Sequence, residues 1–278
     1  MGFVFSADFF ANEINGGAEL NDQEVISCLR ESGRDITAVH SEELTPAYIE
    51  ENKSSKFIVS NFIKLSEESK ARLADCKYAI YEHDHKYLKA RNPGQWKDFV
   101  APKEEVVNSD FYKKAAAVFC QSSFHSDIIK KNLNLNNVVS LGGNLWPDPV
   151  LDLLENLSER DKHKRCSIME SAIPSKNTGA AIKYCKAKSL EYQLVKSMSY
   201  VEFLTELAAN DTLVFFPSTP ETLSRIVVEA RMAGMRVITN SLIGATHEDW
   251  FNLKGKPLID RMRAKRAEIT NKVIGELE

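Results

Sequence analysis

Two acidic residues, Glu221 and Glu229, lie eight positions apart in a segment that also contains a Pro-Ser turn and a later glycine. If the residues between them are helical, they span about 12 Å, and each carboxylate can accept a hydrogen bond from a hydroxyl group of one extended ligand. The N–H groups of Thr222, Leu223 and Ser224 would then lie where a helix begins and could hold a phosphate. The alternative is a pair of solvated helix glutamates.

A lysine and a polar loop follow two other candidate strands. Lys176 comes after the apolar residues 166–169, and the segment 196–200, with Met198 and Tyr200, comes after the next apolar run. In open parallel sheets, ligands bind beyond the carboxyl ends of the strands. These loops are therefore expected to contribute to a binding site.

The first candidate strand is followed by Gly16, Gly17 and Glu19. Glycine lets the backbone approach a ligand closely, although a Gly-Gly pair alone usually marks only a turn. The loop lacks the Gly-x-Gly-x-x-Gly spacing of dinucleotide-binding oxidoreductases, which disfavours that class.

The triplet His83, Asp84 and His85 follows another candidate strand and suggests a metal site. Adjacent residues of an extended chain point to opposite sides, and the sequence offers no obvious third histidine or cysteine ligand. We therefore predict no metal site. Structural histidines whose ring nitrogens are satisfied within the fold remain an equal alternative to a functional role.

The elements that carry these residues alternate between strand and helix. Short apolar runs predict strands at residues 2–6, 36–39, 57–60, 78–81, 117–120 and 138–141, and again at 166–169, 192–195, 213–216 and 236–239. Helical periodicity is found at residues 25–29, 124–129, 179–186, 201–207 and 226–233, and Gly33 and Gly234 fit as helix ends. This alternation predicts right-handed βαβ units and parallel sheets.

Two such series suggest two α/β domains, at residues 1–148 and 149–256, with a long charged helix at 257–278 that can pack back on the first domain. The turn at residues 147–149 and the charged stretch up to Arg165 separate the series. We interpret the basic run 162–165 as part of a solvated linker between the domains.

Composition narrows the class of protein. The chain has 278 residues, enough for two domains, and its apolar content of 43% with 27% charged residues is typical of a globular protein. A net charge of −3, from 36 basic and 39 acidic residues, gives no general attraction to nucleic acid. Five scattered cysteines without a CxxC pair, and no apolar stretch near membrane-spanning length, predict a cytoplasmic protein with reduced thiols.

The second-half segment closely resembles the glutamate-x7-glutamate signature of retaining glycosyltransferases with the GT-B fold, family 4. Those proteins have a strand that ends in Pro-Ser, a first glutamate, and Glu-Ala-x-x-x-Gly before the next strand. The matching residues here are Pro217, Ser218, Glu221, Glu229, Ala230 and Gly234. The resemblance spans nearly the whole chain and implies two Rossmann-like domains whose parallel sheets face a central cleft.

The resemblance also implies roles for the paired acids and the amino-terminal loop. Glu221 would bind the donor sugar, Glu229 would bind the ribose, and the N–H groups of residues 222–224 would hold the diphosphate. The loop with Gly16, Gly17 and Glu19 is similar to a Gly-Gly-x-Glu loop that these enzymes place beside the donor sugar and phosphates.

Other roles follow from the same resemblance. Lys176 matches the diphosphate-binding lysine, His83 would line the acceptor side of the reaction centre, and the segment with Met198 and Tyr200 corresponds to the region that usually contacts the base. The sequence departs from the family at residues 170–171, where Glu-Ser replaces a Gly-Arg pair. That departure puts neutralisation of the diphosphate in question.

Arg225 could replace the missing arginine. It follows Ser224 in the expected first turn of the helix, and a guanidinium can bind phosphate oxygens in bidentate fashion. The alternative is that Arg225 points into solvent.

The sequence therefore predicts a metal-independent glycosyltransferase that moves a sugar from a nucleotide-sugar, expected to be a UDP-sugar, to a hydroxyl group of a glycan or other acceptor. Retention at the anomeric carbon is implied by the family resemblance. One alternative is a GT-B-like protein that binds a nucleotide-sugar or glycan without turnover. Another is an enzyme that glycosylates modified bases in DNA, for which the net charge gives no support.

Overall fold

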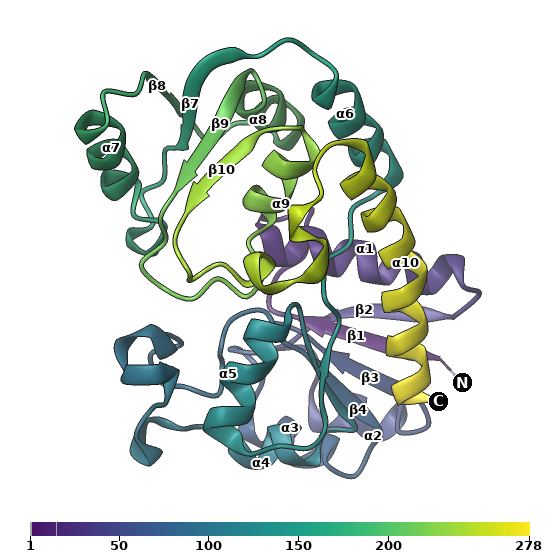
Figure 1. Ribbon diagram of the computed structural model, residues 1–278. Coiled ribbons are helices and arrows are strands. Elements are labelled where there is room, and N and C mark those ends of the chain that lie inside the picture. Colours follow the sequence, from purple (N-terminus) through teal and green to yellow (C-terminus); the bar gives the residue numbers. More distant parts are fainter. Residues whose placement is uncertain (1, 15) are drawn as a thin grey trace. The chain divides into compact units, whose positions relative to one another are not determined.

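Within residues 2–14 and 16–278, which the computed structural model describes, the strands form one six-stranded and one four-stranded parallel sheet (Figure 1). The chain divides into two compact units, each built around one sheet. The N-terminal unit comprises Met1–Leu145 with Lys265–Glu278, and the C-terminal unit comprises Trp146–Ala264. The predicted α/β class with two Rossmann-like sheets is confirmed.

The sheet of the N-terminal unit has the order β2-β1-β3-β4-β5-β6, and all neighbouring strands are parallel. Its strands are β1 (Phe3–Ala7), β2 (Ile36–His40), β3 (Lys56–Val59), β4 (Tyr78–Tyr81), β5 (Ala117–Cys120) and β6 (Val138–Ser140). β1, β4 and β5 are buried at every position. This burial explains their continuous apolar sequences, because both faces of the sheet are covered.

Helices cover both faces of this sheet. On one face, α1 (Gly17–Glu31) and the end of α10 (Lys256–Leu277) share a core in which Leu29 and Val273 lie with Phe5. The core of the other face includes residues from α2 (Pro46–Glu51), α3 (Glu67–Leu73), α4 (Ser109–Lys114) and α5 (Ser123–Leu133). Short 3-10 segments, Pro93–Gln95, Lys97–Phe99 and Lys103–Glu105, lie between β4 and β5.

The sequence pattern missed the short helices α2, α3 and α4. Each has only six or seven residues, so its apolar periodicity is incomplete. Side-chain caps mark the start of two of them: Thr45 accepts a hydrogen bond from the N–H of Tyr48, and Ser66 accepts one from the N–H of Ser69. Such caps satisfy N–H groups that the first turn leaves unpaired.

The sheet of the C-terminal unit has the order β10-β9-β7-β8. Its strands are β7 (His163–Met169), β8 (Tyr192–Val195), β9 (Asn210–Phe215) and β10 (Arg236–Thr239). The helices are α6 (Asp148–Ser158), α7 (Thr178–Ala187), α8 (Tyr200–Leu207) and α9 (Arg225–Met232), with 3-10 segments at Pro174–Lys176, Gly244–His247 and Asp249–Asn252. Residues of α6, α8 and α9 share one core, and α7 packs in a separate core that contains Val214 of β9.

The interpretation of the stretch from residue 147 to Arg165 as a turn and a charged linker was wrong. α6 begins with Pro149 in its first turn and buries Leu151, Leu154 and Leu157, while residues 163–165 already belong to β7. Proline fits the first turn of a helix because the N–H that it lacks would be unpaired there. The leucine spacing of three is helical and supplies the face that enters the core.

Gly234 ends α9 with a φ of +78°, a conformation that favours glycine. A Cβ atom at this position would lie 3.3 Å from the backbone oxygen of Ser158 at the end of α6. Glycine is therefore required here both for its backbone conformation and for the close approach of α6.

The last helix, α10, has the charged sequence that was expected of residues 257–278, with apolar side chains at helical spacing. Met262, Ile269 and Val273 are fully buried. No helix in the described part of the chain combines the length and apolar character needed to cross a bilayer.

All five cysteines lie within the described ranges and are free thiols. Cys76 is partly exposed and the others, Cys28, Cys120, Cys166 and Cys185, are buried. This placement agrees with the expected reduced thiols.

Candidate functional site

In the C-terminal unit, Lys176 follows β7, Met198 follows β8 and Glu221 follows β9, at the carboxyl ends of these strands. Tyr200 lies at the start of α8, and Arg225 and Glu229 lie in α9.

The span of about 12 Å expected between Glu221 and Glu229 assumed a helix that begins at Glu221, but Glu221 is not in a helix. Two backbone hydrogen bonds join Glu221 to the segment around Ile243 as a parallel β-bridge. The backbone N–H of Glu221 donates to the carbonyl oxygen of Leu242 at 2.8 Å, and its carbonyl oxygen accepts from the N–H of Gly244 at 2.9 Å. The helical rise therefore does not describe the separation of Glu221 from Glu229.

Glu221 and Lys176 form an ion pair, with Lys176 Nζ 2.8 Å from Glu221 Oε1. The side chain of Lys176 is 29% exposed and that of Glu221 is 14% exposed, so solvent or a ligand can reach the pair. The loop of Lys176 is held beside the end of β9, because the N–H of Ser218 donates to the oxygen of Ser175 at 2.9 Å. The structure thus brings together two residues that the sequence predicted separately.

The beginning of α9 differs from the prediction. Ser224 is its N-cap with a left-handed backbone (φ 77°), and the helix starts at Arg225. Thr222 and Leu223 precede the helix, and Leu223 is fully buried, where it anchors the segment in the core. The hydroxyl oxygen of Ser224 is buried and has no hydrogen-bond partner among the described residues.

Glu229 lies in α9, only 3% exposed, and its Oε1 atom receives several contacts. The indole Nε1 of Trp146 donates to it at 2.9 Å and the hydroxyl of Tyr200 donates at 2.6 Å. The Nε atom of Arg225 lies 3.4 Å away. Burial and the neighbouring Glu229 carboxylate raise the pKa of Tyr200, so its hydroxyl stays protonated and remains a donor.

Arg225 does not point into solvent, so that alternative was wrong. It is 9% exposed, its guanidinium carbon lies 4.5 Å from the centre of the Trp146 ring, and its Nη2 donates to the Tyr200 hydroxyl at 3.2 Å. The spacing of four residues on one helix face places it beside Glu229. In this structure the guanidinium is part of the Glu229 cluster.

Tyr200 and Met198, the two residues predicted to contact a base, have different surroundings. Tyr200 begins α8 behind a capping box made by Ser199 and Glu202, and its hydroxyl reaches Glu229. Met198 is 40% exposed in the preceding loop. The structure therefore brings Tyr200, but not Met198, into the Glu229 cluster.

In the N-terminal unit, the predicted Gly-Gly loop is the start of α1. Gly16 is the N-cap, Gly17 is the first helical residue, and Glu19 lies in the first turn. Burial raises the pKa of Glu19, and the amide of Asn61 lies 3.4 Å from its Oε1. A Cβ atom at Gly16 would collide with the Glu19 carboxylate. Glycine at this position therefore makes room for that carboxylate.

His83 lies directly beyond β4 and has partners at both ring nitrogens. Its Nε2 is 2.6 Å from Oδ1 of Asp22, and Gln121 contacts its Nδ1. The other oxygen of Asp22 accepts a hydrogen bond from Ser60 at 2.5 Å. His83 is 8% exposed. With Ser60, which follows β3, and Gln121, which follows β5, it forms a hydrogen-bonded wall at the ends of these strands.

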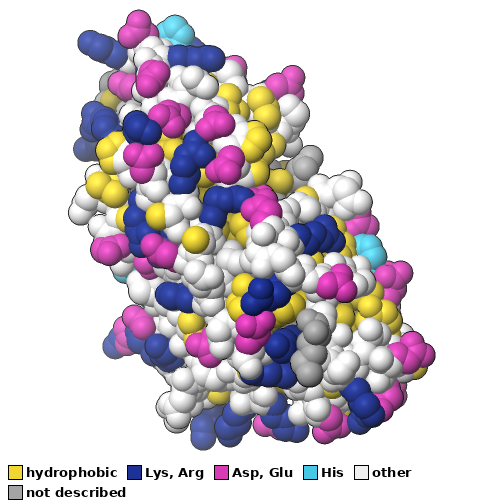
Figure 2. Space-filling model, turned by 90° about the vertical axis from the view of Figure 1, so that its right-hand side faces the viewer, with side chains coloured by type: hydrophobic (Ala, Val, Ile, Leu, Met, Phe, Trp, Pro, Cys, Tyr) yellow, Lys and Arg dark blue, Asp and Glu magenta, His cyan; other side chains and the backbone are white. Residues whose placement is uncertain are grey.

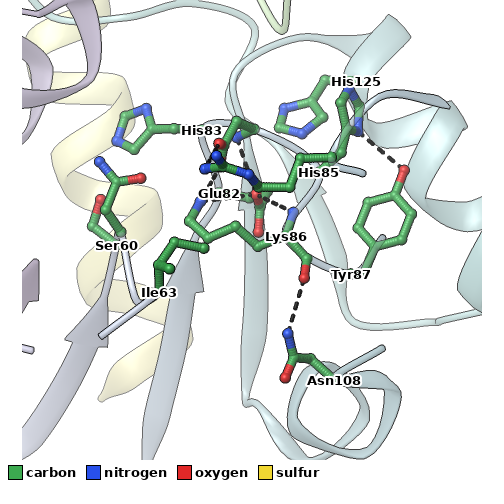
Figure 3. A network of polar contacts seen from close by, with 12 residues as sticks. Ser60, Ile63, Glu82, His83, His85, Lys86, Tyr87, Asn108 and His125 are labelled. Carbon is green, nitrogen blue, oxygen red and sulfur yellow. Dashed lines mark hydrogen bonds and ion pairs between the residues drawn. The ribbon is translucent and has the colours of Figure 1, made fainter. Parts of the chain in front are cut away.

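Glu82 and residues on the other side of His83 form a second network, largely buried (Figure 3). Lys86 Nζ lies 3.1 Å from Glu82 and 2.6 Å from Asp84, and Tyr112 donates to Glu82. Burial opposes the charge of Glu82, but the Lys86 ammonium and the Tyr112 hydroxyl lower its pKa overall. Figure 3 shows Lys86 extending towards Glu82.

His85 and His125 are neighbours in this network, with ring centroids 5.0 Å apart. Burial lowers the pKa of His85 to about 4 and places that of His125 well below its ordinary value. Both rings are therefore neutral near pH 7. His85 Nδ1 contacts the hydroxyl of Tyr87 at 3.0 Å.

The three side chains of the triplet at residues 83–85 have different partners, although the chain here bends and His85 has a left-handed backbone (φ 35°) rather than an extended one. His83 pairs with Asp22, Asp84 pairs with Lys86 and Arg91, and His85 pairs with Tyr87. Among the described residues, no group of three or more His, Cys, Asp or Glu side chains gathers in a way that could hold a metal ion.

Sequence reasoning missed the partners of the candidate residues: Asp22, Ser60 and Gln121 around His83, and Trp146 beside Glu229. Each comes from a remote part of its unit; Trp146 and Glu229 are 83 residues apart. No local pattern links such residues, and a single buried tryptophan is ordinarily a core residue.

No protein-family model matches the chain, and no curated protein matches its sequence. Solved structures match it over nearly its whole length. HepE of Anabaena, solved in complex with UDP and in complex with UDP and glucose, gives TM-scores of 0.58 and 0.55 at 11% and 13% identity. These matches cover 100% of this chain and 96% and 92% of HepE.

Two further structures are named transferases. An α-glucosyltransferase in complex with UDP and DNA containing an HMU base has a TM-score of 0.51 at 10% identity, covering 98% of this chain and 94% of that one. The lipopolysaccharide outer core galactosyltransferase WaaB has a TM-score of 0.51 at 11% identity, covering 100% and 92%. At these identities the likeness shows the fold, and the chain has the GT-B fold.

Proposed function

We propose that this protein is a glycosyltransferase that moves a sugar from a nucleotide-sugar, preferentially a UDP-sugar, to an acceptor hydroxyl. The observation that carries the proposal is the pair of acids beyond β9. Glu221 is accessible and paired with Lys176, and Glu229 is buried and oriented by hydrogen-bond donors. UDP complexes among the structural neighbours support this choice of nucleotide.

In the proposed donor complex, Glu221 accepts a hydrogen bond from the sugar and Glu229 accepts one from the ribose. Lys176 exchanges part of its contact with Glu221 for the diphosphate, whose charge grows as the glycosidic bond breaks. The N–H groups of residues 222–224, in the segment that leads into α9, are proposed to donate to the same diphosphate. Met198, in the loop before α8, and Tyr200, the first residue of α8, are proposed to face the base.

In the N-terminal unit, Gly16, Gly17 and Glu19 are proposed to lie beside the donor, and His83 on the acceptor side. Because both ring nitrogens of His83 have partners, we assign it to the wall of the site rather than to proton transfer. We propose that the anomeric configuration is retained. Lys176 and the backbone take the charge that a metal ion neutralises in other glycosyltransferases.

The first experiment is a thermal-shift screen against nucleoside diphosphates and nucleotide-sugars. Ligand at one hundred times its dissociation constant stabilises the folded state by about 2.7 kcal/mol. UDP should give the largest shift, and transfer or donor hydrolysis should persist in EDTA. Activity lost in EDTA and restored by manganese would contradict metal independence, and the absence of any nucleotide shift would refute the proposal.

A second candidate, binding of a nucleotide-sugar without turnover, is favoured by Glu170 and Ser171, which stand where related enzymes carry Gly-Arg. It predicts a shift with UDP-sugars but neither transfer nor hydrolysis. The DNA-modifying alternative is tested by a gel shift with duplex DNA. On the face drawn in Figure 2, basic and acidic side chains are interspersed, which does not favour DNA.

A further inference from the structure

Among the described residues, the hydrogen-bond donors to the Glu229 carboxylate all reach the same oxygen. Trp146 from the start of the C-terminal unit, Tyr200 from α8 and Arg225 from α9 all direct nitrogen or oxygen atoms at Oε1, at 2.9, 2.6 and 3.4 Å. Within the described part of the chain, no residue donates a hydrogen bond to Oε2. The two oxygens of one carboxylate therefore have different surroundings.

From this asymmetry we infer that Trp146 and Tyr200 are positioning residues that fix Glu229 so that Oε2 is the oxygen left for a ribose hydroxyl. The inference rests on the proposed function, in which Glu229 binds the ribose. Rotation of the carboxylate would break the bonds from the indole and the phenol together. A carboxylate held in this way loses little further freedom when the ligand binds.

The charge balance supports this assignment. A carboxylate that is 3% exposed is costly without a compensating partner, and Arg225 supplies the opposite charge. Trp146 contributes twice, because its ring lies against the guanidinium of Arg225 at 4.5 Å while its N–H binds Glu229. Replacing Trp146 by Phe removes the N–H but keeps an aromatic ring beneath Arg225.

The chain offers a matched control for this substitution. Trp250 is 3% exposed, belongs to the same core cluster as Trp146, and is not one of the donors to Glu229 Oε1. Trp250→Phe removes an equal volume from that core. Tyr200→Phe is a second positioning variant that deletes a single oxygen.

The experiment measures binding of UDP, 2′-deoxy-UDP and 3′-deoxy-UDP by calorimetry to the wild type and the three variants. A hydrogen bond to a charged acceptor implies that the wild type binds at least one deoxy analogue about tenfold or more weakly than UDP. Trp146→Phe and Tyr200→Phe should weaken UDP binding and reduce this preference for the intact ribose. Trp250→Phe should keep it.

The outcomes separate two failures. If the wild type binds no UDP, the proposed function and the inference both fall. If UDP binds and Trp146→Phe and Tyr200→Phe keep the full ribose preference, only the positioning role is refuted. Tighter UDP binding by Tyr200→Phe would also refute it, since the phenol would then compete with the ligand. If Trp146→Phe does not fold, Tyr200→Phe alone decides.

Discussion

Two ion pairs, Glu82–Lys86 in the N-terminal unit and Lys176–Glu221 in the C-terminal unit, differ in how deeply they are buried. In the N-terminal unit, the charged side chains of Glu82 and Lys86 are fully buried and paired with each other. In the C-terminal unit, Lys176 and Glu221 keep 29% and 14% of their side-chain surface exposed. A buried pair stabilises a fold only while it is complete, whereas an exposed pair can exchange partners at little cost. The first arrangement holds a framework, and the second suits a site that must bind and release.

The largest effect is expected from breaking the buried pair. Glu82→Ala leaves Lys86 buried with only Asp84 as its anionic partner and deprives Tyr112 of an acceptor. We expect the free energy of unfolding to fall by about 3–5 kcal/mol. Glu221→Ala, the matched change in the exposed pair, should cost about 1 kcal/mol or less. Urea denaturation measures the free energy of unfolding of both variants. If the two substitutions lowered it equally, the proposed difference between the buried and the exposed pair would be refuted.

The second largest effect is expected from acid, which should lower the free energy of unfolding through the buried His85. The unfolded chain protonates His85 near its ordinary pKa of 6.5, whereas burial keeps the folded ring neutral down to a pKa of about 4. Between these pH values the unfolded state binds more protons, so stability falls as the pH falls. The loss from His85 is on the order of 3 kcal/mol.

The acid prediction is tested by measuring the free energy of unfolding between pH 7.5 and pH 4. His85→Gln should make that dependence less steep. His163→Gln, which alters an exposed histidine of the C-terminal unit, should leave it unchanged. An unchanged slope in His85→Gln would contradict the assignment.

Within the C-terminal unit, the two acids should separate nucleotide binding from sugar transfer. Glu229→Ala should weaken UDP binding by about 1.5–3 kcal/mol, because it removes a charged hydrogen-bond acceptor. Glu221→Ala should chiefly lower transfer while nucleotide affinity stays nearly intact. Calorimetry with UDP and a transfer assay measure the two effects. If both variants bound UDP and transferred sugar like the wild type, the roles proposed for Glu229 and Glu221 would be refuted.

The smallest of these effects concerns Lys176. Lys176→Ala should lower turnover more than tenfold, about 1.4 kcal/mol in activation free energy. Because the ion pair is partly exposed, the melting temperature should change little. Steady-state kinetics beside a melting curve distinguish this from unfolding; unaltered turnover would leave the backbone N–H groups as the proposed charge acceptors.

The strands could be predicted because parallel strands covered on both faces are continuous apolar runs. The runs 78–81, 117–120, 192–195 and 236–239 coincide with β4, β5, β8 and β10. α6 was missed although its signals were present, a proline in the first turn and leucines three residues apart. Its prolines and acidic residues were interpreted as a turn.

The candidate site was predictable in part. Lys176 and Glu221 meet because their loops follow strands of one sheet, and strand-following loops share an edge. The environment of His83 was not predictable, since its partner Asp22 lies 61 residues earlier on α1. The burial of Arg225 likewise depends on Trp146, whose position is fixed only by the packed core. Tertiary packing, which leaves no periodic trace in the sequence, decides such contacts.

The reactivity of the buried thiols can be used to measure local opening of the fold. Burial raises the pKa of Cys28 to about 11 and that of Cys185 to about 12, so reactive thiolate is scarce in the folded state. Because the thiolate is the nucleophile, a thiol reagent modifies these positions mainly when the surrounding core opens. Cys28 and Cys120 report on the N-terminal unit, and Cys166 and Cys185 on the C-terminal unit. Rates of modification, resolved by mass spectrometry, can thus follow each unit in the native chain without any engineered label.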